Sequence, residues 1–261
     1  MIYNRDCIDI LPNLDKESID LIITSPPYNI GKEYEESLIL EEYKEFQKKV
    51  ISECSRLLKN TGSLFWEIGT YIKGKKIIPL DILLFDLFIQ SGLIFKNRII
   101  WHFEYGLHST KKLSGRYETV LWFVKSEDYV FNLDEIRVPQ KYPRKKHFKG
   151  PKKGEYSCNP LGKNPVDVWK IPNVVHNHPE KTSHPCQFPE ELIRRLVLGF
   201  SNKGDIVLDP FGGSGTTGVI CEKLGRESIL IEKEWKYCEI AEDRIKRVKE
   251  QATLDKVTVE G

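Results

Sequence analysis

The stretch Asp205-Ile206-Val207-Leu208-Asp209-Pro210-Phe211-Gly212-Gly213-Ser214-Gly215-Thr216-Thr217 decides the fold class of this chain. It opens with a short apolar run, typical of a strand that is buried on both faces in a parallel sheet. A glycine-rich turn follows, and we expect a helix after it, over residues 216–224. A strand, a turn and a helix in this order predict an open α/β sheet with a ligand at the carboxyl end of the strand.

A second stretch near the other end of the chain has the same arrangement. It reads Ile19-Asp20-Leu21-Ile22-Ile23-Thr24-Ser25-Pro26-Pro27-Tyr28. Its apolar first half predicts another buried parallel strand, and a polar turn over residues 24–28 follows it. Because open α/β sheets place their ligands at the carboxyl ends of the strands, we expect the two turns to form one site.

Strand-like and helix-like segments alternate along most of the chain, which is the signature of βαβ units. Helices are expected over residues 40–58, 77–90, 189–200, 216–224 and 235–249, with residues 252–261 frayed. Strands are expected over residues 19–23, 63–68, 95–101, 119–124, 205–208 and 228–231, with a polar loop over residues 104–117 near the site. The pattern predicts a Rossmann-like α/β fold, in which a mostly parallel sheet has helices on both faces.

Between residues 131 and 179 the periodicity disappears, and several prolines and glycines argue against regular structure. From Arg137 to Lys153 this insertion contains eight Lys or Arg residues and no acidic residue. Such charge runs are often solvated loops. The alternative is a surface that neutralises the phosphates of a nucleic acid. The candidate DNA contacts are Arg144, Lys145, Lys146, Lys149, Lys152 and Lys153.

The composition is that of an ordinary globular protein: 261 residues, 40% hydrophobic, 30% charged and a net charge of +2. No apolar run reaches the roughly 18 residues that a membrane span needs, and no secretory signal is apparent. The six cysteines form no Cys-x-x-Cys pair, which favours free thiols in a reducing compartment. We therefore expect a cytoplasmic protein that does not contact membranes. We also expect no metal, because prolines and the lack of a matching Cys pair favour a loop at His176, His178 and His184.

The glycine-rich turn suits a nucleotide-like cofactor without phosphates. It lacks the Gly-Lys-Ser/Thr ending of a triphosphate-binding loop and the spacing of a dinucleotide-binding loop. Glu232 ends a predicted strand 23 residues after Asp209, and an acid at such a distance accepts hydrogen bonds from ribose hydroxyls. Asp209 lies where a carboxylate can meet an amino group. One ligand that has a ribose, an ammonium group and no phosphate is S-adenosylmethionine. The alternative is a tight turn that only packs a helix against a strand.

The Ser-Pro-Pro-Tyr turn suits a planar base that carries an exocyclic amine. Such an amine is a poor nucleophile, because its lone pair is delocalised into the ring. The Ser25 hydroxyl and the Pro26 carbonyl can accept its two hydrogens, and the two prolines hold these acceptors in place. Tyr28 offers a ring on which an extruded base can stack. Methylation of a ring carbon would need a Pro-Cys nucleophile, which this turn lacks.

These motifs resemble those of the bacterial DNA amino-methyltransferases in the circularly permuted order called the β class. The resemblance covers residues 1–125 and 180–248. It implies that Ser25, Pro26, Pro27 and Tyr28 are catalytic. It also implies a catalytic half over residues 1–131, a target recognition insertion over residues 132–179 and a cofactor-binding half over residues 180–261.

The same resemblance assigns the cofactor site. It implies that S-adenosylmethionine contacts Asp6 and, through its backbone, Cys7. The segment His184-Pro185-Cys186-Gln187-Phe188-Pro189 resembles one that closes over the methionine end, with Phe188 in place of the usual Lys. The full set of cofactor-binding candidates is Asp6, Cys7, His184, Pro185, Phe188, Asp209, Pro210, Phe211, Gly213, Ser214, Gly215, Thr217 and Glu232.

The resemblance favours methylation of cytosine N4, because relatives with Ser-Pro-Pro-Tyr tend to use cytosine and those with Asp-Pro-Pro-Tyr adenine N6. It implies double-stranded DNA as the partner and a role in a restriction–modification system beside a cognate restriction endonuclease. The chain would act as a monomer or a homodimer. The remaining alternatives are adenine N6, an RNA or small-molecule substrate, and a DNA-binding regulator without catalysis.

Overall fold

A sheet of eight strands forms the centre of the computed structural model, in which residues 1–31, 38–73 and 76–259 are described. Along the sheet, the order is β1 (Ile2–Asn4), β10 (Glu227–Glu232), β9 (Ile206–Asp209), β2 (Ile19–Thr24), β3 (Leu58–Ile68), β7 (Tyr117–Val124), β6 (Ile94–His102) and β8 (Val168–Lys170). Among these described strands, β7 alone runs antiparallel to its neighbours. The predicted fold class, a mostly parallel α/β sheet, is confirmed.

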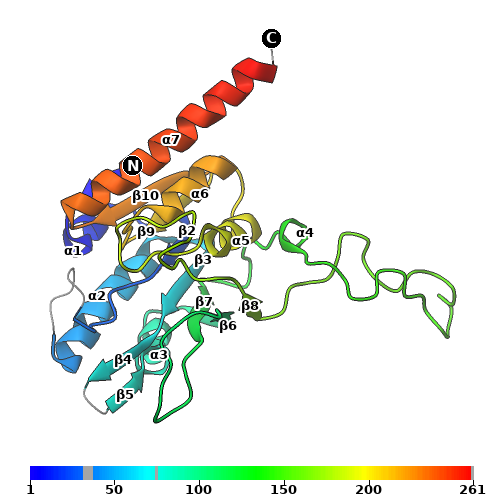
Figure 1. Ribbon diagram of the computed structural model, residues 1–261, viewed down its shortest axis with the longest axis horizontal. Coiled ribbons are helices and arrows are strands. Elements are labelled where there is room, and N and C mark those ends of the chain that lie inside the picture. Colours follow the sequence, from blue (N-terminus) through cyan, green and yellow to red (C-terminus); the bar gives the residue numbers. More distant parts are fainter. Residues whose placement is uncertain (32–37, 74–75, 260–261) are drawn as a thin grey trace.

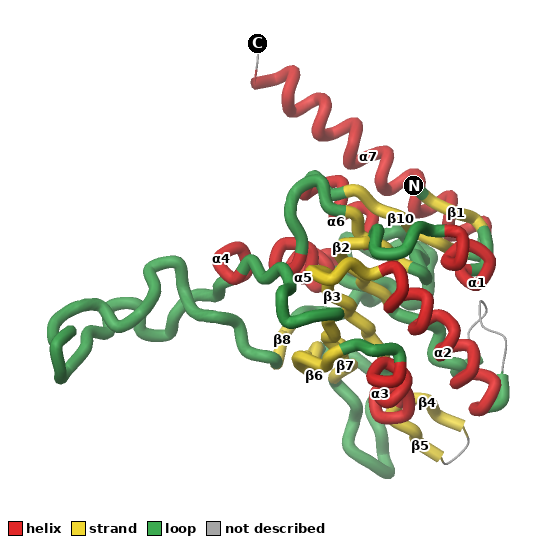
Figure 2. Tube along the Cα trace, turned by 180° about the vertical axis from the view of Figure 1, so that it is seen from behind, coloured by secondary structure: helices red, strands yellow, loops and turns green. Residues whose placement is uncertain are grey.

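Helices cover both faces of the sheet (Figures 1 and 2). The helices α1 (Cys7–Ile10), α2 (Leu40–Leu57) and α3 (Leu80–Gln90) pack on one face, and α5 (Glu190–Phe200) and α6 (Thr216–Leu224) on the other. The last helix, α7 (Trp235–Val259), packs beside α6 and extends beyond the sheet in Figure 1. Strand β2 is buried on both faces: Ile22 joins the first core, and Leu21 and Ile23 join the second. This is why its sequence is a continuous apolar run.

The structure corrects three predicted boundaries. Residues 77–79 are not helical: β5 (Lys76–Pro79) pairs with β4 (Thr70–Lys73) in a separate hairpin. The helix begins only after Pro79, because a proline disfavours the helical conformation of the residue before it. The strand predicted from residue 63 begins at Leu58, where it pairs with Ile19 of β2. Finally, α7 continues to Val259, so the expected fraying from residue 252 is wrong. The short strand β1 was not predicted.

Three tryptophans belong to the core. Trp66 and Trp101 are buried, and Trp122 packs against Phe65 and Phe200. Trp169 lies in β8, which forms the edge of the main sheet although it belongs to the predicted insertion. The Trp169 side chain is buried, so it anchors the insertion to the sheet.

The basic part of the insertion forms a long projection, which we call the arm (residues 138–163). Figure 1 shows that it extends away from the sheet, after α4 (Leu133–Ile136). Two isolated antiparallel β-bridges connect its outgoing and returning segments. One joins Val138 and Lys163 at the base, and the other joins Lys146 and Tyr156 further out. Within the described ranges, no helix combines the length and apolar character needed to cross a membrane.

Candidate active site

The two turns singled out by the sequence meet at a buried carboxylate. Strands β2 and β9 are neighbours in the sheet, so both turns begin at its carboxyl edge. The Thr24 hydroxyl donates a hydrogen bond of 2.7 Å to Asp209 Oδ1, and the Thr217 hydroxyl donates one of 2.7 Å to Oδ2. Burial raises the pKa of Asp209 to about 6, and these hydrogen bonds oppose the rise. Asp209 therefore joins the polar turn to the glycine turn.

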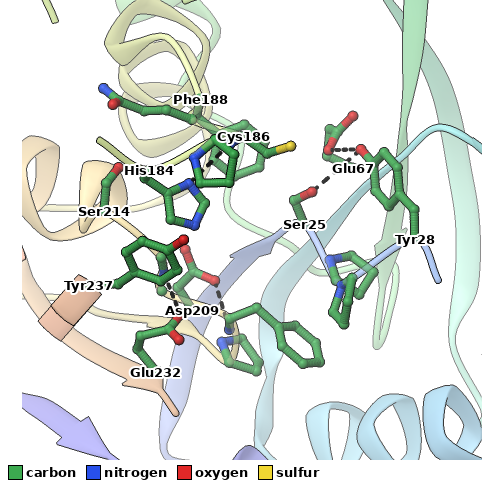
Figure 3. Close-up of a pocket in the computed structure, with 18 of the residues that line it drawn as sticks. Ser25, Tyr28, Glu67, His184, Cys186, Phe188, Asp209, Ser214, Glu232 and Tyr237 are labelled. Carbon is green, nitrogen blue, oxygen red and sulfur yellow. Dashed lines mark hydrogen bonds between the residues drawn. The ribbon is translucent and has the colours of Figure 1, made fainter. Parts of the chain in front are cut away.

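A cavity of about 500 Å³ opens between the two turns (Figure 3). This volume is within the range of about 300–1,000 Å³ that is typical of small-ligand sites. The four predicted catalytic residues line it, from Ser25 to Tyr28. So do eleven of the cofactor-binding candidates: Asp6, Cys7, His184, Pro185, Phe188, Asp209, Pro210, Phe211, Gly213, Ser214 and Glu232. Gly215 and Thr217 do not line the cavity. Thr217 supports it through Asp209.

Two glycines of the glycine turn differ in their surroundings: Gly213 lines the cavity, and Gly215 lies between two helices. Gly213 has a φ of 49°, and its N–H donates a hydrogen bond of 2.9 Å to Glu232 Oε2. The Glu234 N–H donates to Glu232 Oε1 at 2.8 Å, which fixes this carboxylate at the edge of the cavity. Gly215 instead packs α6 against α7, because a Cβ there would lie 2.5 Å from Cβ of Ala241. Gly215 therefore serves the packing of α6 against α7, whereas Gly213 remains a candidate for cofactor binding.

The segment around His184 closes one wall of the cavity. The His184 ring is buried and packs edge-on against Tyr237, with the ring centroids 4.3 Å apart. A Cβ on Gly213 would lie 3.1 Å from Nε2 of His184, so the glycine lets this wall approach the turn. On the opposite side, the Asp6 carboxylate accepts a hydrogen bond from the Ile8 N–H and caps α1. Cys7 is buried behind it.

The Ser-Pro-Pro-Tyr side of the cavity contains a chain of hydrogen bonds (Figure 3). The Tyr28 hydroxyl donates to Glu67 Oε2 at 2.6 Å, and the Ser25 hydroxyl donates to the Tyr28 oxygen at 3.4 Å. Each hydroxyl thus points its hydrogen toward Glu67. The lone pairs of Ser25 Oγ remain to accept hydrogens from a ligand in the cavity, which suits a donor such as an amine.

Two carboxyl groups lie behind Tyr28: that of Glu67 is buried, and that of Glu118 is half-buried. Glu67 is on β3 and Glu118 on the neighbouring β7, and both line the cavity. Burial raises the pKa of Glu67 well above its usual value, and the charge of Glu118 raises it further. Burial likewise raises the pKa of Glu118. Gly69 makes room for this arrangement, because a Cβ there would lie 2.7 Å from the Tyr28 ring.

Sequence reasoning missed several residues that line the cavity. Glu67 had a visible signal, since it is a charged residue inside the apolar strand Leu64-Phe65-Trp66-Glu67-Ile68. Glu118 lies just before the strand predicted over residues 119–124, and nothing in its surroundings marks it. Tyr237 is on α7, and Asn173 lies in the irregular segment after β8, so only the fold brings them to the cavity.

The predicted DNA contacts are elsewhere. Arg144 and the five predicted lysines of the arm are exposed and do not line the cavity; these lysines are Lys145, Lys146, Lys149, Lys152 and Lys153. Across the described ranges, no cluster of three or more His, Cys, Asp or Glu side chains could hold a metal ion, and this includes the region of His176 and His178.

Comparison with known proteins gives consistent matches. A family model for N6 and N4 methyltransferases, described as DNA methylase, matches residues 19–243. The type II methyltransferase M.BglII of Bacillus subtilis is 51% identical over 92% of this chain and 67% of its own length. The DNA adenine methyltransferase YhdJ of Escherichia coli (strain K12) is 34% identical over 94% of this chain and 82% of its own length.

Solved structures agree on the architecture. TTHA0409 of Thermus thermophilus, in complex with S-adenosyl-L-methionine, superposes with a TM-score of 0.67 and 25% identity over 95% of this chain and 93% of that one. The cytosine-N4-specific PvuII DNA methyltransferase superposes with a TM-score of 0.75 and 20% identity, over 95% of this chain and 89% of that one. At this identity, the second match speaks for the fold alone.

Proposed function

Because the chain belongs to the N6/N4 DNA methylase family, we propose that this DNA methyltransferase modifies the exocyclic N4 of cytosine within a short duplex site. The observation that carries the proposal is the hydrogen-bond chain from Ser25 through Tyr28 to Glu67. It leaves Ser25 Oγ as an acceptor at the wall of the cavity, opposite the glycine turn. An acceptor there suits an amine hydrogen and disfavours a carbonyl oxygen.

The cofactor is S-adenosylmethionine, and the residues of the cavity fit it. When bound, it supplies a methyl group on a positively charged sulfur. We propose that Gly213 allows its close approach and that Glu232 accepts hydrogen bonds from the ribose hydroxyls. Each Glu232 oxygen already accepts one backbone hydrogen bond and keeps a further lone pair for a ligand. His184, Pro185 and Phe188 would enclose the methionine end from above the glycine turn.

On the opposite wall, Ser25 Oγ and the Pro26 carbonyl oxygen would accept the two amine hydrogens. The prolines limit backbone motion, so the acceptors are in place before the base arrives. With the amine held by Ser25 and Pro26, its nitrogen would accept the methyl group that the bound cofactor supplies, and the electron pair of the broken carbon–sulfur bond would stay on sulfur. The proton that the nitrogen releases would pass to Ser25 and along the chain toward Glu67. The Tyr28 ring, held by its hydrogen bond to Glu67, would stack on the extruded base.

Adenine N6 is the second candidate. It is supported by the similarity to YhdJ, whose name describes an adenine methyltransferase. The exocyclic amines of adenine and cytosine offer the same two hydrogens, so the Ser25 acceptor suits either. Cytosine is favoured because Ser25 stands where adenine-directed relatives tend to carry Asp. The side chain of Ser25 is shorter and uncharged, so the position of the base relative to the cofactor differs between the two cases.

The arm is the proposed DNA contact outside the cavity. Its lysines and Arg144 are exposed and can neutralise phosphates, which positions a duplex without reading its bases. The similarity to type II methyltransferases supports a role in a restriction–modification system, beside a cognate endonuclease in the cytoplasm. We propose that the enzyme acts as a monomer or a homodimer.

Nucleoside analysis tests the proposed base. Plasmid DNA is incubated with the protein and S-adenosylmethionine labelled in its methyl group, then digested to nucleosides and separated. We expect the label in N4-methylcytosine. Label in N6-methyladenine alone would overturn the cytosine assignment, and label in neither would overturn amine methylation. Sequencing of the same DNA locates the modified positions and defines the recognition site.

A further inference from the structure

We propose that the loop between β6 and β7 is a wedge that enters the DNA duplex and keeps the target base extruded. This inference rests on the proposed function. The wedge loop comprises residues 104–116, and its two active side chains are Leu107 and Leu113. The partner is duplex DNA at the base pair whose base enters the cavity.

The wedge loop begins and ends at the cavity. Before the loop, the cavity is lined by Trp101 of β6 and by Phe103, which follows this strand. After the loop, it is lined by Glu118 of β7. The Phe103 N–H donates a hydrogen bond of 3.0 Å to the Arg116 carbonyl, which closes the base of the loop. The Asn173 side chain donates to the Tyr105 carbonyl at 3.2 Å and ties the loop to a further wall residue. A duplex whose base lies in the cavity therefore passes next to this loop.

Two leucines of the loop are turned out to solvent. Leu107 and Leu113 are each 94% exposed, more than any other large hydrophobic side chain in the described part of the chain. Internal hydrogen bonds shape the loop that presents them. Arg116 donates to the Leu107 carbonyl at 3.1 Å, and the Ser109 N–H donates to Ser114 Oγ at 3.0 Å. These hydrogen bonds hold the loop in a conformation in which both leucines are exposed to solvent.

The charges around the leucines match a nucleic acid. His108, Lys111, Lys112 and Arg116 lie in the loop, and its one acidic residue, Glu104, is paired with Lys170 at 2.6 Å. Lys111 and Lys112 are exposed, and they lie between the two leucines in the sequence. Cations beside exposed apolar side chains suit a surface in which phosphates flank a stack of bases. Proteins that kink or open DNA insert Leu, Ile, Phe or Met between base steps in this way.

The wedge would lower the free energy that is needed to extrude the target base. Extruding a base from a duplex costs a few kcal/mol, and the cost is lowest for a base that is already mismatched. A leucine in the vacated space would stabilise the extruded state and leave the chemistry in the cavity unchanged. Its contribution should therefore disappear when the target base is unpaired from the start.

The test compares two duplexes that contain the mapped recognition site, one fully paired and one with a mismatch at the target base. The double variant Leu107→Ala/Leu113→Ala is measured beside Ile82→Ala, a control at an exposed apolar position of α3. We expect single-turnover methylation of the paired duplex to fall by about tenfold in the double variant, with little loss on the mismatched duplex. The control should match the wild type on both.

Each other outcome has a defined meaning. If the wild type methylates neither duplex, the proposed function fails and the wedge falls with it. If the wild type methylates both and the double variant equals it on the paired duplex, the wedge alone is refuted. An equal loss on paired and mismatched duplexes would also refute it, since the leucines would then support the cavity rather than extrusion. Fluorescence of 2-aminopurine at the target position gives a second readout, and the double variant should show a smaller increase on binding.

Discussion

Replacing Asp209 with Asn should change how the stability of the cofactor-free protein depends on pH. The Asp209 carboxyl is buried, and burial raises its pKa from 3.8 to about 6. The native state therefore binds a proton that the unfolded chain has lost between these two values, and stability falls as the pH rises through this window. A shift of about two pKa units corresponds to about 3 kcal/mol at 1.36 kcal/mol per unit.

The Asn side chain has nearly the same shape and does not titrate. The difference in unfolding free energy, variant minus wild type, should therefore rise by about 3 kcal/mol between about pH 4 and pH 6.5 and stay constant above that. Urea denaturation at several pH values measures it, and the subtraction removes the contributions of the other carboxyl groups. If the unfolding free energies of the two proteins changed with pH in parallel, Asp209 would not be a buried carboxyl group with a raised pKa at the junction of the two turns. Saturating S-adenosylmethionine should stabilise the wild type more than the variant, because the carboxylate is expected to face the cationic ligand.

Three further substitutions probe the site and the arm. Ser25→Ala should leave cofactor affinity in calorimetry nearly unchanged and lower turnover about 100-fold, since one positioned acceptor is removed; unchanged turnover would remove Ser25 from the mechanism. In the variant Glu67→Gln, the amide can donate a hydrogen bond to the Tyr28 oxygen and so reverse the direction of the hydrogen bonds between Ser25, Tyr28 and residue 67. Turnover should then fall by about 100-fold with cofactor binding retained. Turnover equal to that of the wild type would show that these hydrogen bonds do not orient Ser25. Replacing the five predicted lysines of the arm (Lys145, Lys146, Lys149, Lys152 and Lys153) with Ala should reduce the slope of log affinity against log salt by about 0.9 for each phosphate that is no longer neutralised. The control Lys48→Ala/Lys49→Ala on α2 should leave the slope unchanged. An unaltered slope in the arm variant would mean that these lysines do not bind DNA.

The central part of the fold could be predicted because its strands are buried on both faces. Such strands must be apolar throughout, so β2 and β9 are visible as runs in the sequence, and the turns at their carboxyl ends mark the ligand edge. Both turns do meet there, through Asp209. The prediction was wrong where pairing rather than burial decides the structure. The hairpin of β4 and β5 and the early part of β3 depend on partners that no local pattern reveals.

The site was predicted to the extent that it lies in short, distinctive motifs. Residues that reach the cavity from elsewhere were missed, because their role depends on register and packing. Glu118 faces the cavity only because β7 pairs antiparallel with β3, and Tyr237 only because α7 packs beside α6. Glu67 is the one missed residue that the sequence could have revealed. An acidic residue in the middle of an apolar strand is costly to bury, so it indicates a polar partner in the interior of the fold.

The central claim is that the cofactor and the target amine share the cavity between the two turns. A crystal structure with S-adenosylhomocysteine and a duplex containing the mapped site tests it most directly. We expect the sulfur beside the glycine turn and the exocyclic amine on Ser25 Oγ and the Pro26 carbonyl, with space for one methyl group between nitrogen and sulfur. A target base bound outside this cavity, or an amine held by other residues, would contradict the account.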